Sequence, residues 1–294
     1  MRLNQTIRKI SQLLKQHNIE DSYFEARVLL GYVLKLSPEE ILTQPEYYLN
    51  AQQLETLNTI VQRRIKREPA AYIVGHKEFY GIDFMIDRRV LIPRPETELL
   101  VEEALKYLEE RCSSSANSSK RKVVADIGTG CGAIAISLAL NNSDVKIFAT
   151  DISQDALEVA RRNAYNHNVQ DRISFLHGNL LEPVTEHVDL IIANLPYIEH
   201  TELDNLSTEI NRFEPHIALD GGNDGLLYIE QLIRQSKEKL HNNGCIMLEI
   251  GYNQTQHITE FTGHSFHNVH YEFVSDPNDI KRVIKIFPEY LSLI

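Results

Sequence analysis

The stretch Asp126-Ile127-Gly128-Thr129-Gly130-Cys131-Gly132 decides the fold. It continues the apolar run Val123–Ile127, which is typical of a buried strand, and leads into the helical pattern of Ala133–Leu140. Glycine suits this position because the chain must turn tightly and a ligand can then approach the backbone without meeting a Cβ atom. A strand, a glycine-rich turn and a helix in this order indicate a unit of an α/β sheet.

Further apolar runs after this stretch alternate with helical patterns. They are Lys146–Thr150, Ile173–His177, Leu190–Ala193 and Cys245–Ile250. Such alternation builds a parallel sheet with helices on both faces. The last two runs, Val269–Val274 and Arg282–Phe287, leave no room for a helix between them and should be antiparallel. The predicted fold is therefore α/β and Rossmann-like: a mostly parallel sheet with an antiparallel C-terminal strand.

The first part of the chain has the pattern of short helices. Apolar residues recur at helical spacing in residues 7–14 and 23–34. Ser37, followed by Pro38 and a glutamate, and Asn50 both have the features of helix starts. These patterns predict a small helical bundle.

The chain is predicted to have three parts. Residues 1–74 form the helical bundle, residues 75–92 form a β-hairpin linker, and residues 93–294 form the α/β domain. The polar run Cys112–Ser119 should be a loop within the last part.

The formal net charge of −11 argues against a protein that wraps nucleic acid by counterion release. An acidic enzyme is better suited to a basic protein partner. The basic run Arg63, Arg64, Lys66 and Arg67 is interpreted as a solvated helix face, with a local basic patch as the alternative.

The chain has no apolar run near the roughly 20 residues that span a bilayer, and residues 1–20 lack the apolar region of a signal peptide. Cys112, Cys131 and Cys245 are too few and too scattered for a disulfide framework or a zinc cluster, so no metal is expected. These features predict a cytoplasmic protein without membrane contact.

The glycine loop and Asp151 together predict a nucleoside-type ligand. Asp151 ends the next strand, roughly 20 residues on, as expected of a carboxylate that binds ribose hydroxyls. The Gly-x-Gly-x-Gly spacing is shorter than that of a dinucleotide site, and no Gly-Lys-Ser/Thr follows as in a P-loop. Asp126 would repel a phosphate but suits a cationic amino group. S-adenosyl-L-methionine, which has a ribose and two positive groups but no phosphate, fits this pattern better than NAD or ATP.

The predicted cofactor site gathers the loop and the residues that follow the next strands. Its members are Gly128, Thr129, Gly130, Cys131, Gly132, Asp151, Asn179, Leu180 and Asn194. Asn179 could bond to the adenine edge, with Leu180 as apolar cover, or could serve only as a turn residue after Gly178. The sequence leaves both interpretations open.

The segment Asn194-Leu195-Pro196-Tyr197 supplies the predicted catalytic residues. It follows a predicted strand, where the ligands of open α/β sheets bind. An amide nitrogen is a poor nucleophile because its lone pair is delocalised into the carbonyl group. The Asn194 side-chain oxygen and the Leu195 carbonyl could accept its two N–H groups and stabilise the charge that develops during methyl transfer. Tyr197 offers a flat face to a planar amide. Such a turn is also a common way to end a strand.

These residues resemble class I methyltransferases that act on exocyclic or amide nitrogens, whose usual pattern is Asn-Pro-Pro-Tyr. More narrowly, nearly the whole chain resembles the release-factor glutamine methyltransferases (PrmC, also called HemK). The resemblance is carried by Arg67-Glu68-Pro69, Glu78-Phe79-Tyr80-Gly81, Leu91-Ile92-Pro93-Arg94-Pro95-Glu96-Thr97-Glu98, Gly221-Gly222-x-Asp224-Gly225-Leu226 and Glu249-Ile250-Gly251-Tyr252. The family's usual first proline is Leu195 here, which loses rigidity but keeps a backbone carbonyl.

The resemblance implies methylation of the glutamine N5 in the Gly-Gly-Gln loop of class 1 peptide-chain release factors, with S-adenosyl-L-homocysteine as the second product. It also implies that the helical part, residues 1–74, helps to dock the release factor. Asn194 would be the main catalytic residue, Leu195 would orient the substrate, and Pro196 and Tyr197 would shape the pocket. Substrate-binding residues would also include Arg94 and Glu96, near the cofactor or substrate entrance with Glu98, although these residues equally suit an ordinary helix start.

Other functions remain to be weighed. An adenine-N6 methyltransferase acting on nucleic acid would need a basic groove and usually base-flipping apparatus. A non-catalytic module that binds S-adenosylmethionine and a translation factor would not need Asn194 or Tyr197. A dehydrogenase is disfavoured by the short glycine loop.

Overall fold

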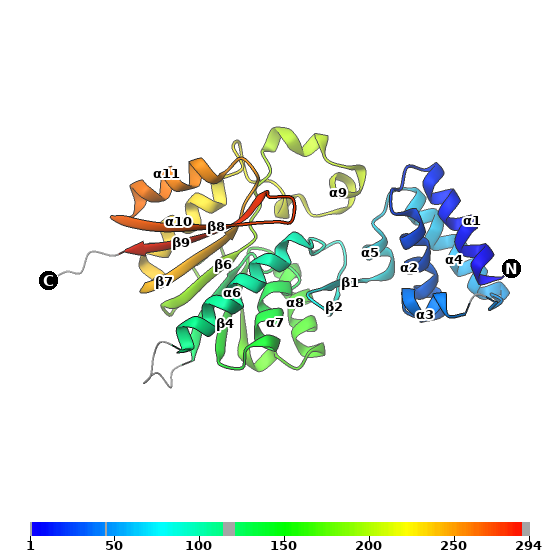
Figure 1. Ribbon diagram of the computed structural model, residues 1–294, viewed down its shortest axis with the longest axis horizontal. Helices are drawn as coiled ribbons and strands as arrows, with labels where there is room; N and C mark the ends of the chain where they lie inside the picture. Colours follow the sequence, from blue (N-terminus) through cyan, green and yellow to red (C-terminus); the bar gives the residue numbers. More distant parts are fainter. Residues whose placement is uncertain (1, 45, 114–120, 290–294) are drawn as a thin grey trace. The chain divides into compact units, whose positions relative to one another are not determined.

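The structure, a computed structural model, describes residues 2–44, 46–113 and 121–289 (Figure 1). The chain forms two compact units. The first comprises the residues up to His76 together with Ser207–Phe213, and the second comprises Lys77–Leu206 and Glu214 onward. Most of the predicted loop Cys112–Ser119 lies outside the described residues.

The first unit is a small helical bundle. Its helices are α1 (Leu3–Gln16), α2 (Ser22–Leu34), α3 (Pro38–Leu42), α4 (Ala51–Ile65), α5 (Ala70–Val74) and α9 (Thr208–Phe213). Both predicted helix starts are confirmed, since Ser37 and Asn50 each form a capping box with the residue three positions on. Leu3, Leu14 and Leu29 are fully buried in the bundle core.

Carboxylates pair with the three arginines of the basic run at the end of α4. Arg64 is 5% exposed and forms ion pairs with Glu25 at 2.5 Å and Glu209 at 3.2 Å. Arg67 also pairs with Glu209, at 2.8 Å, and Arg63 pairs with Glu68 at 2.7 Å. The interpretation of this run as a solvated helix face is therefore wrong for Arg64, which folding buries between acidic side chains from distant parts of the sequence, whereas Lys66 is exposed as predicted.

The second unit contains a seven-stranded sheet with the order β5-β4-β3-β6-β7-β9-β8. Its strands are β3 (Lys122–Ile127), β4 (Val145–Asp151), β5 (Ile173–His177), β6 (Val188–Ala193), β7 (Leu240–Glu249), β8 (Asn268–Ser275) and β9 (Lys281–Glu289). The pairs among β5, β4, β3, β6 and β7 are parallel, whereas β9 is antiparallel to both β7 and β8. This confirms the predicted Rossmann-like sheet.

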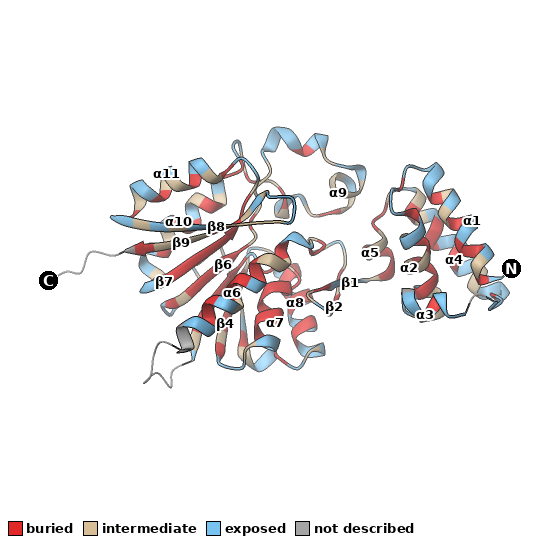
Figure 2. Cartoon of the chain, viewed as in Figure 1, coloured by how far each residue is buried: buried red, intermediate tan, exposed pale blue. Residues whose placement is uncertain are grey.

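Helices cover both faces of the sheet (Figure 1). One layer holds α6 (Glu96–Ser113), α7 (Ala133–Asn141) and α8 (Gln154–Asn166), and the other holds α10 (Leu227–Lys239) and α11 (Thr255–Ser265). Short 3-10 turns complete the connections at Gln170–Arg172, His200–Asn205 and His216–Ala218. The central strands are buried along most of their length (Figure 2) because helices cover them from both sides.

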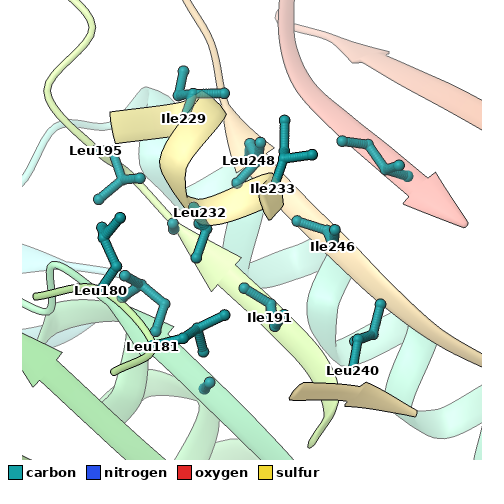
Figure 3. Packing of buried hydrophobic residues seen from close by; sticks show 14 of the residues in the cluster. Leu180, Leu181, Ile191, Leu195, Ile229, Leu232, Ile233, Leu240, Ile246 and Leu248 are labelled. Carbon is teal, nitrogen blue, oxygen red and sulfur yellow. The ribbon is translucent and has the colours of Figure 1, made fainter. Parts of the chain in front are cut away.

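Branched apolar side chains hold the α10 layer against the sheet. Ile191 of β6 and Ile246 of β7 pack in one cluster with Leu232 and Ile233 of α10 (Figure 3). All four are fully buried. Each such side chain contributes about 1.5–3 kcal/mol to the stability of the fold. This rigid layer carries the ends of the strands at which the candidate site lies.

A two-stranded hairpin, β1 (His76–Phe79) and β2 (Ile82–Met85), precedes α6. The Tyr80 N–H in its turn donates to the Glu98 carboxylate at 2.9 Å, which ties the hairpin to the first turn of α6. Asn163 of α8 accepts from the Met85 N–H and donates to the Met85 carbonyl, both at 2.9 Å. The hairpin is therefore held on two helices of the second unit.

Candidate active site

A cavity of about 280 Å³ opens at the carboxyl ends of the parallel strands. The chain leaves β3 toward β4 and later returns to β6 on the other side of β3, so the strand order reverses here. Ligands of open α/β sheets bind at such a reversal. The residues lining the cavity are Arg89, Val90, Leu91, Gly128, Gly130, Thr150, Asp151, Ile152, Ser153, Ala156, Asn179, Leu180, Asn194, Leu195, Pro196, Pro215, Ile217, Ala218 and Tyr228.

The glycine loop after β3 is bound to the end of β4 by its own backbone. The N–H groups of Gly128 and Thr129 both donate to the Thr150 carbonyl at 2.9 Å, and the Gly130 N–H donates to Asp151 Oδ2 at 2.9 Å. Gly128 has a φ of 71°, a left-handed conformation that favours glycine. The loop therefore presents bare backbone to the cavity beside a carboxylate.

Asp151 is the acidic group on the cavity wall. Besides the bond from Gly130, its Oδ1 accepts from the Ser153 N–H at 2.8 Å. Burial raises the pKa of this carboxyl group above its usual range, while the bonds from Ser153 and Gly130 act in the opposite direction. Each carboxylate oxygen has a further lone pair, so the group can still accept a hydroxyl from a ligand.

Asp126 lies beneath the loop and not on the cavity wall. It is fully buried, and its Oδ2 accepts from Thr129 Oγ1 at 2.6 Å and the Ala135 N–H at 3.1 Å. Its Oδ1 has no hydrogen-bond partner among the described residues. Burial raises the pKa of this carboxyl group to about 7.

The other loop residues predicted for the cofactor face inward and do not line the cavity. Cys131 is 3% exposed, its carbonyl accepts from Asn163 Nδ2 at 2.9 Å, and burial raises the pKa of its thiol to about 12. A Cβ on Gly132 would stand 2.9 Å from Ile136 and 3.3 Å from Ala160. Cys131 and Gly132 therefore support close packing of the loop.

Asn179 and Leu180 both line the cavity after β5. The Asn179 carbonyl accepts from the Glu182 N–H at 3.1 Å, and Asn179 Nδ2 donates to the Glu182 carboxylate at 2.9 Å. Asn179 is thus a turn residue that also borders the cavity. Leu180, at 7% exposure and a φ of 52°, joins the core cluster beneath it.

Asn194 lines the cavity and is linked through its side chain to a buried carboxyl group. Its Nδ2 donates to Thr97 Oγ1 at 2.9 Å, and Thr97 Oγ1 donates to Glu249 Oε2 at 2.6 Å. Thr97 lies in the first turn of the helix α6, and Glu249 ends the strand β7. Neither Thr97 nor Glu249 has a predicted role, although both fall within stretches that resemble the family.

Tyr197 does not line the cavity. Its hydroxyl lies 3.5 Å from Glu249 Oε1, and burial raises the pKa of the phenol to about 12. Gln254 Nε2 donates to the carbonyls of Tyr197 at 3.1 Å and Gly225 at 3.0 Å. A Cβ on Gly225 would stand 2.3 Å from the Tyr197 carbonyl oxygen. Gln254 and Gly225 thus fix the end of the Asn194–Tyr197 segment, a role that no local pattern reveals.

Arg94, Glu96 and Glu98 do not line the cavity either. Arg94 forms an ion pair with the buried Glu214, which also accepts from the Ile92 N–H at 3.2 Å. Glu96 is exposed at the first position of α6, and Glu98 binds the hairpin. Arg94 and Glu98, but not Glu96, thus tie the segment around the start of α6 to the hairpin and to the chain that leads to Pro215 on the cavity wall.

Eight of the residues predicted for the site meet around one cavity, all from the second unit. They are Gly128, Gly130, Asp151, Asn179, Leu180, Asn194, Leu195 and Pro196. The sequence did not single out the apolar part of the wall, which includes Val90, Ile152, Ala156, Ile217 and Tyr228.

Two further observations concern metals and membranes. No group of three or more His, Cys, Asp or Glu side chains in the described part of the chain could hold a metal ion. None of the helices described between residues 2 and 289 combines the length and hydropathy of a membrane span.

Two family descriptions match the chain. Residues 5–75 match the PrmC N-terminal domain, and residues 101–213 match the methyltransferase small domain. The first match covers most of the helical bundle. The second covers the glycine loop, Asp151 and the Asn194–Tyr197 segment.

Curated relatives align over most of the chain. A release factor glutamine methyltransferase of Clostridium acetobutylicum is 36% identical over 262 residues, which cover 88% of this chain and 89% of the relative. A bifunctional methyltransferase of Rickettsia bellii is 37% identical over 295 residues, covering 93% of this chain and 52% of the relative. The chain therefore spans about half the length of the bifunctional relatives it matches.

Among solved structures, the hMettl16 catalytic domain in complex with the MAT2A 3'UTR hairpin 1 has a TM-score of 0.57 at 14% identity. The alignment covers 90% of this chain and 92% of that one. At this identity the likeness establishes the methyltransferase fold, and the RNA of that complex belongs to that protein alone.

Proposed function

The chain belongs to the release factor glutamine methyltransferase family, and from this premise we propose its reaction. It transfers a methyl group from S-adenosyl-L-methionine to the side-chain amide nitrogen (N5) of the glutamine in the Gly-Gly-Gln motif of class 1 peptide-chain release factors. One observation carries the proposal: Asn194, Leu195 and Pro196 border the same cavity as the glycine loop and Asp151.

The residues around the cavity fit S-adenosyl-L-methionine. The backbone at Gly128 and Gly130, here called the cradle, is open to a ligand because glycine has no side chain. A side chain at either position would be strained at the positive φ angle. Asp126 lies fully buried beneath the loop, and the negative charge that it carries when ionised favours a ligand with positive charge and disfavours phosphate. Asp151 would accept the ribose hydroxyls, and Ile152 and Leu180 would cover an adenine. When bound, the cofactor supplies an electrophilic methyl group.

Asn194 and Leu195 act on the substrate amide. Since Asn194 Nδ2 is engaged by Thr97, its Oδ1 is the atom left to accept an N–H of the glutamine side chain. The Leu195 carbonyl has no hydrogen-bond partner among the described residues and can accept the second N–H. Two acceptors hold the nitrogen and stabilise the positive charge that develops on it. The N-methylated amide is then acidic enough to lose its proton to water.

The helical bundle docks the release factor. Tyr23 and Phe24 of α2 are each 51% exposed, and the Arg27 guanidinium lies 5.6 and 5.5 Å from their ring centres. Exposed aromatic and arginine side chains are enriched at protein interfaces. The ion pairs of the three arginines at the end of α4, together with the net charge of −11, support a protein partner over nucleic acid.

The test is transfer of labelled methyl groups from S-adenosyl-L-methionine to three acceptors: a class 1 release factor, the same factor with its Gly-Gly-Gln glutamine replaced by alanine, and duplex DNA. Label on the intact factor alone is the expected result. Label on DNA would replace the proposal with an adenine-N6 activity. Cofactor binding without label on any acceptor would leave the non-catalytic alternative.

A further inference from the structure

Two hydrogen bonds join three side chains in a series that runs from the cavity into the core of the second unit. Asn194 Nδ2 donates to Thr97 Oγ1 at 2.9 Å, and Thr97 Oγ1 lies 2.6 Å from Glu249 Oε2. Thr97 is 5% exposed and Glu249 3% exposed, so water does not compete for these bonds. Asn194 directly follows β6, Thr97 lies in α6 and Glu249 ends β7, and these three elements pack against one another.

Glu249 sets the direction of the hydrogen bonds that link these three side chains. A carboxylate can only accept, so the single hydroxyl proton of Thr97 must point to Glu249. The Thr97 oxygen is then an acceptor toward Asn194, which must offer its Nδ2. With Nδ2 turned to Thr97, Asn194 Oδ1 is the atom directed away from the core.

We infer that Thr97 and Glu249 are positioning residues that fix the direction of the Asn194 amide, so that Oδ1 and not Nδ2 meets the substrate. The inference rests on the proposed function, in which Asn194 accepts an N–H of the substrate amide. A donor at that place would repel the substrate N–H instead of binding it. Both residues act through Asn194 and do not line the cavity.

Protonation of Glu249 reverses the direction of these hydrogen bonds. A carboxylic acid can donate to Thr97 Oγ1, which frees the Thr97 proton to donate to Asn194 Oδ1 and turns Nδ2 outward. Burial is the main cause that raises the pKa of Glu249 to about 7. The groups that face it are Thr97, the Tyr197 hydroxyl, Glu96 and Arg282. The transfer rate should therefore fall as the pH falls through about 7.

The kinetic test compares Thr97→Val, which keeps the shape of the side chain but removes the hydroxyl, with Thr97→Ser, which keeps the hydroxyl. For Thr97→Val we expect kcat to fall about 10- to 100-fold, the range that applies to residues that orient metal ligands through a hydrogen bond. The KM for S-adenosyl-L-methionine should change less than about twofold. Thr97→Ser should recover most of the rate.

Thr262→Val provides a matched control. Thr262 is buried like Thr97, and its hydroxyl bonds to the Ile258 carbonyl at 2.7 Å and to Tyr271 at 2.6 Å, but it lies in α11 outside the site. The variant Thr262→Val should be less stable than the wild type. Its transfer rate should still fall as the pH falls through about 7, which is the acid limb of the pH profile. Thr97→Val should lose that limb, because Asn194 no longer responds to Glu249. A kcat of Thr97→Val within threefold of the wild type, with the acid limb intact, would overturn the inference.

A spectroscopic test needs neither a substrate nor a folded Thr97 variant. In protein labelled with 15N at asparagine, the Asn194 side-chain NH2 signal is assigned by its loss in Asn194→Ala. It should shift with pH around a midpoint near 7 in the wild type and should lose this titration in Glu249→Gln. A signal that does not titrate in the wild type would contradict the inference. If the wild type methylates no release factor but the signal titrates, the proposed function fails while the positioning of Asn194 stands.

Discussion

The Cδ2 atom of Leu195 lies 3.2 Å from the point that a Cβ atom on Gly128 would occupy. Leu195 is 5% exposed and belongs to the buried cluster between the sheet and α10 (Figure 3), so it has little room to move. The residue that replaces the family's usual proline therefore packs into the core. Packing of its side chain in the core restricts Leu195, whereas the ring of a proline at this position would restrict the backbone φ angle.

Gly128→Ala should weaken cofactor binding by about tenfold or more. Its φ of 71° costs an alanine about 1–2 kcal/mol, and the methyl group would press on Leu195 within the cradle. Calorimetric titration with S-adenosyl-L-homocysteine measures the binding. Gly263→Ala is the control: it lies in α11 with nothing within 4 Å of an added Cβ, so it should bind normally and gain about 0.5–1 kcal/mol of stability. Normal binding by Gly128→Ala would contradict the assignment of the cradle.

Asp151→Asn should weaken cofactor binding by about tenfold or more. The carboxylate accepts from Gly130 and Ser153 and still has lone pairs for a ribose, whereas an amide replaces one acceptor by a donor. A hydrogen bond to a charged group contributes about 1.5–3 kcal/mol, which sets this range. Binding is measured by the same titration. The exposed Asp144→Asn should bind like the wild type, and an equal loss in both variants would point to a general effect of charge.

Asp126 should make the folded protein less stable as the pH rises. Burial raises the pKa of its carboxyl group from 3.8 to about 7, so between these values the folded state holds a proton that the unfolded chain has released. The free energy of unfolding therefore decreases with rising pH across this window, by at most about 1.4 kcal/mol per pH unit for one group. Urea unfolding from pH 5 to pH 8 should show a shallower decline in Asp126→Asn. The exposed Asp171→Asn should leave the decline unchanged.

Arg64→Met should destabilise the helical bundle. The guanidinium is buried between the carboxylates of Glu25 and Glu209, and its removal takes the partner at 2.5 Å from Glu25, whereas Glu209 keeps its pair with Arg67. Loss of one partner from a buried ion pair costs about 3–5 kcal/mol. Urea unfolding followed by circular dichroism measures the change. Arg8→Met, on the exposed face of α1, should change stability by less than about 0.5 kcal/mol. A similar result for both variants would show that the buried pairs contribute little.

The structural features that depend on residues close together in the sequence could be predicted. Apolar runs such as Leu190–Ala193 identified the parallel strands because central strands are buried on both faces. Ser37 and Asn50 identified helix starts because a capping bond spans only three residues. Gly128 and Asp151 could be predicted as site residues because a glycine-rich turn and the end of an apolar strand can both be recognised from a few consecutive residues.

Contacts between distant residues could not be predicted in this way. Thr97 meets Asn194 across 97 positions and Glu249 across 152 positions. Glu209 meets Arg64 across 145 positions, so the helix α9 packs with the first unit although it lies within the predicted domain 93–294. Periodicity does not encode such pairs. The resemblance to the family identified the stretches that contain Thr97 and Glu249, but it did not identify the residues that these side chains contact.

The measurement that tests the central claim most directly is mass spectrometry of a class 1 release factor after incubation with S-adenosyl-L-methionine and either the wild type or Asn194→Ala. The wild type should add one methyl group, which fragmentation places on the side-chain amide of the Gly-Gly-Gln glutamine. Asn194→Ala should still bind the cofactor but transfer methyl about 10²–10³ times more slowly, as after loss of one group that stabilises transition-state charge. A methyl group on another residue, or an unchanged rate in Asn194→Ala, would contradict the account.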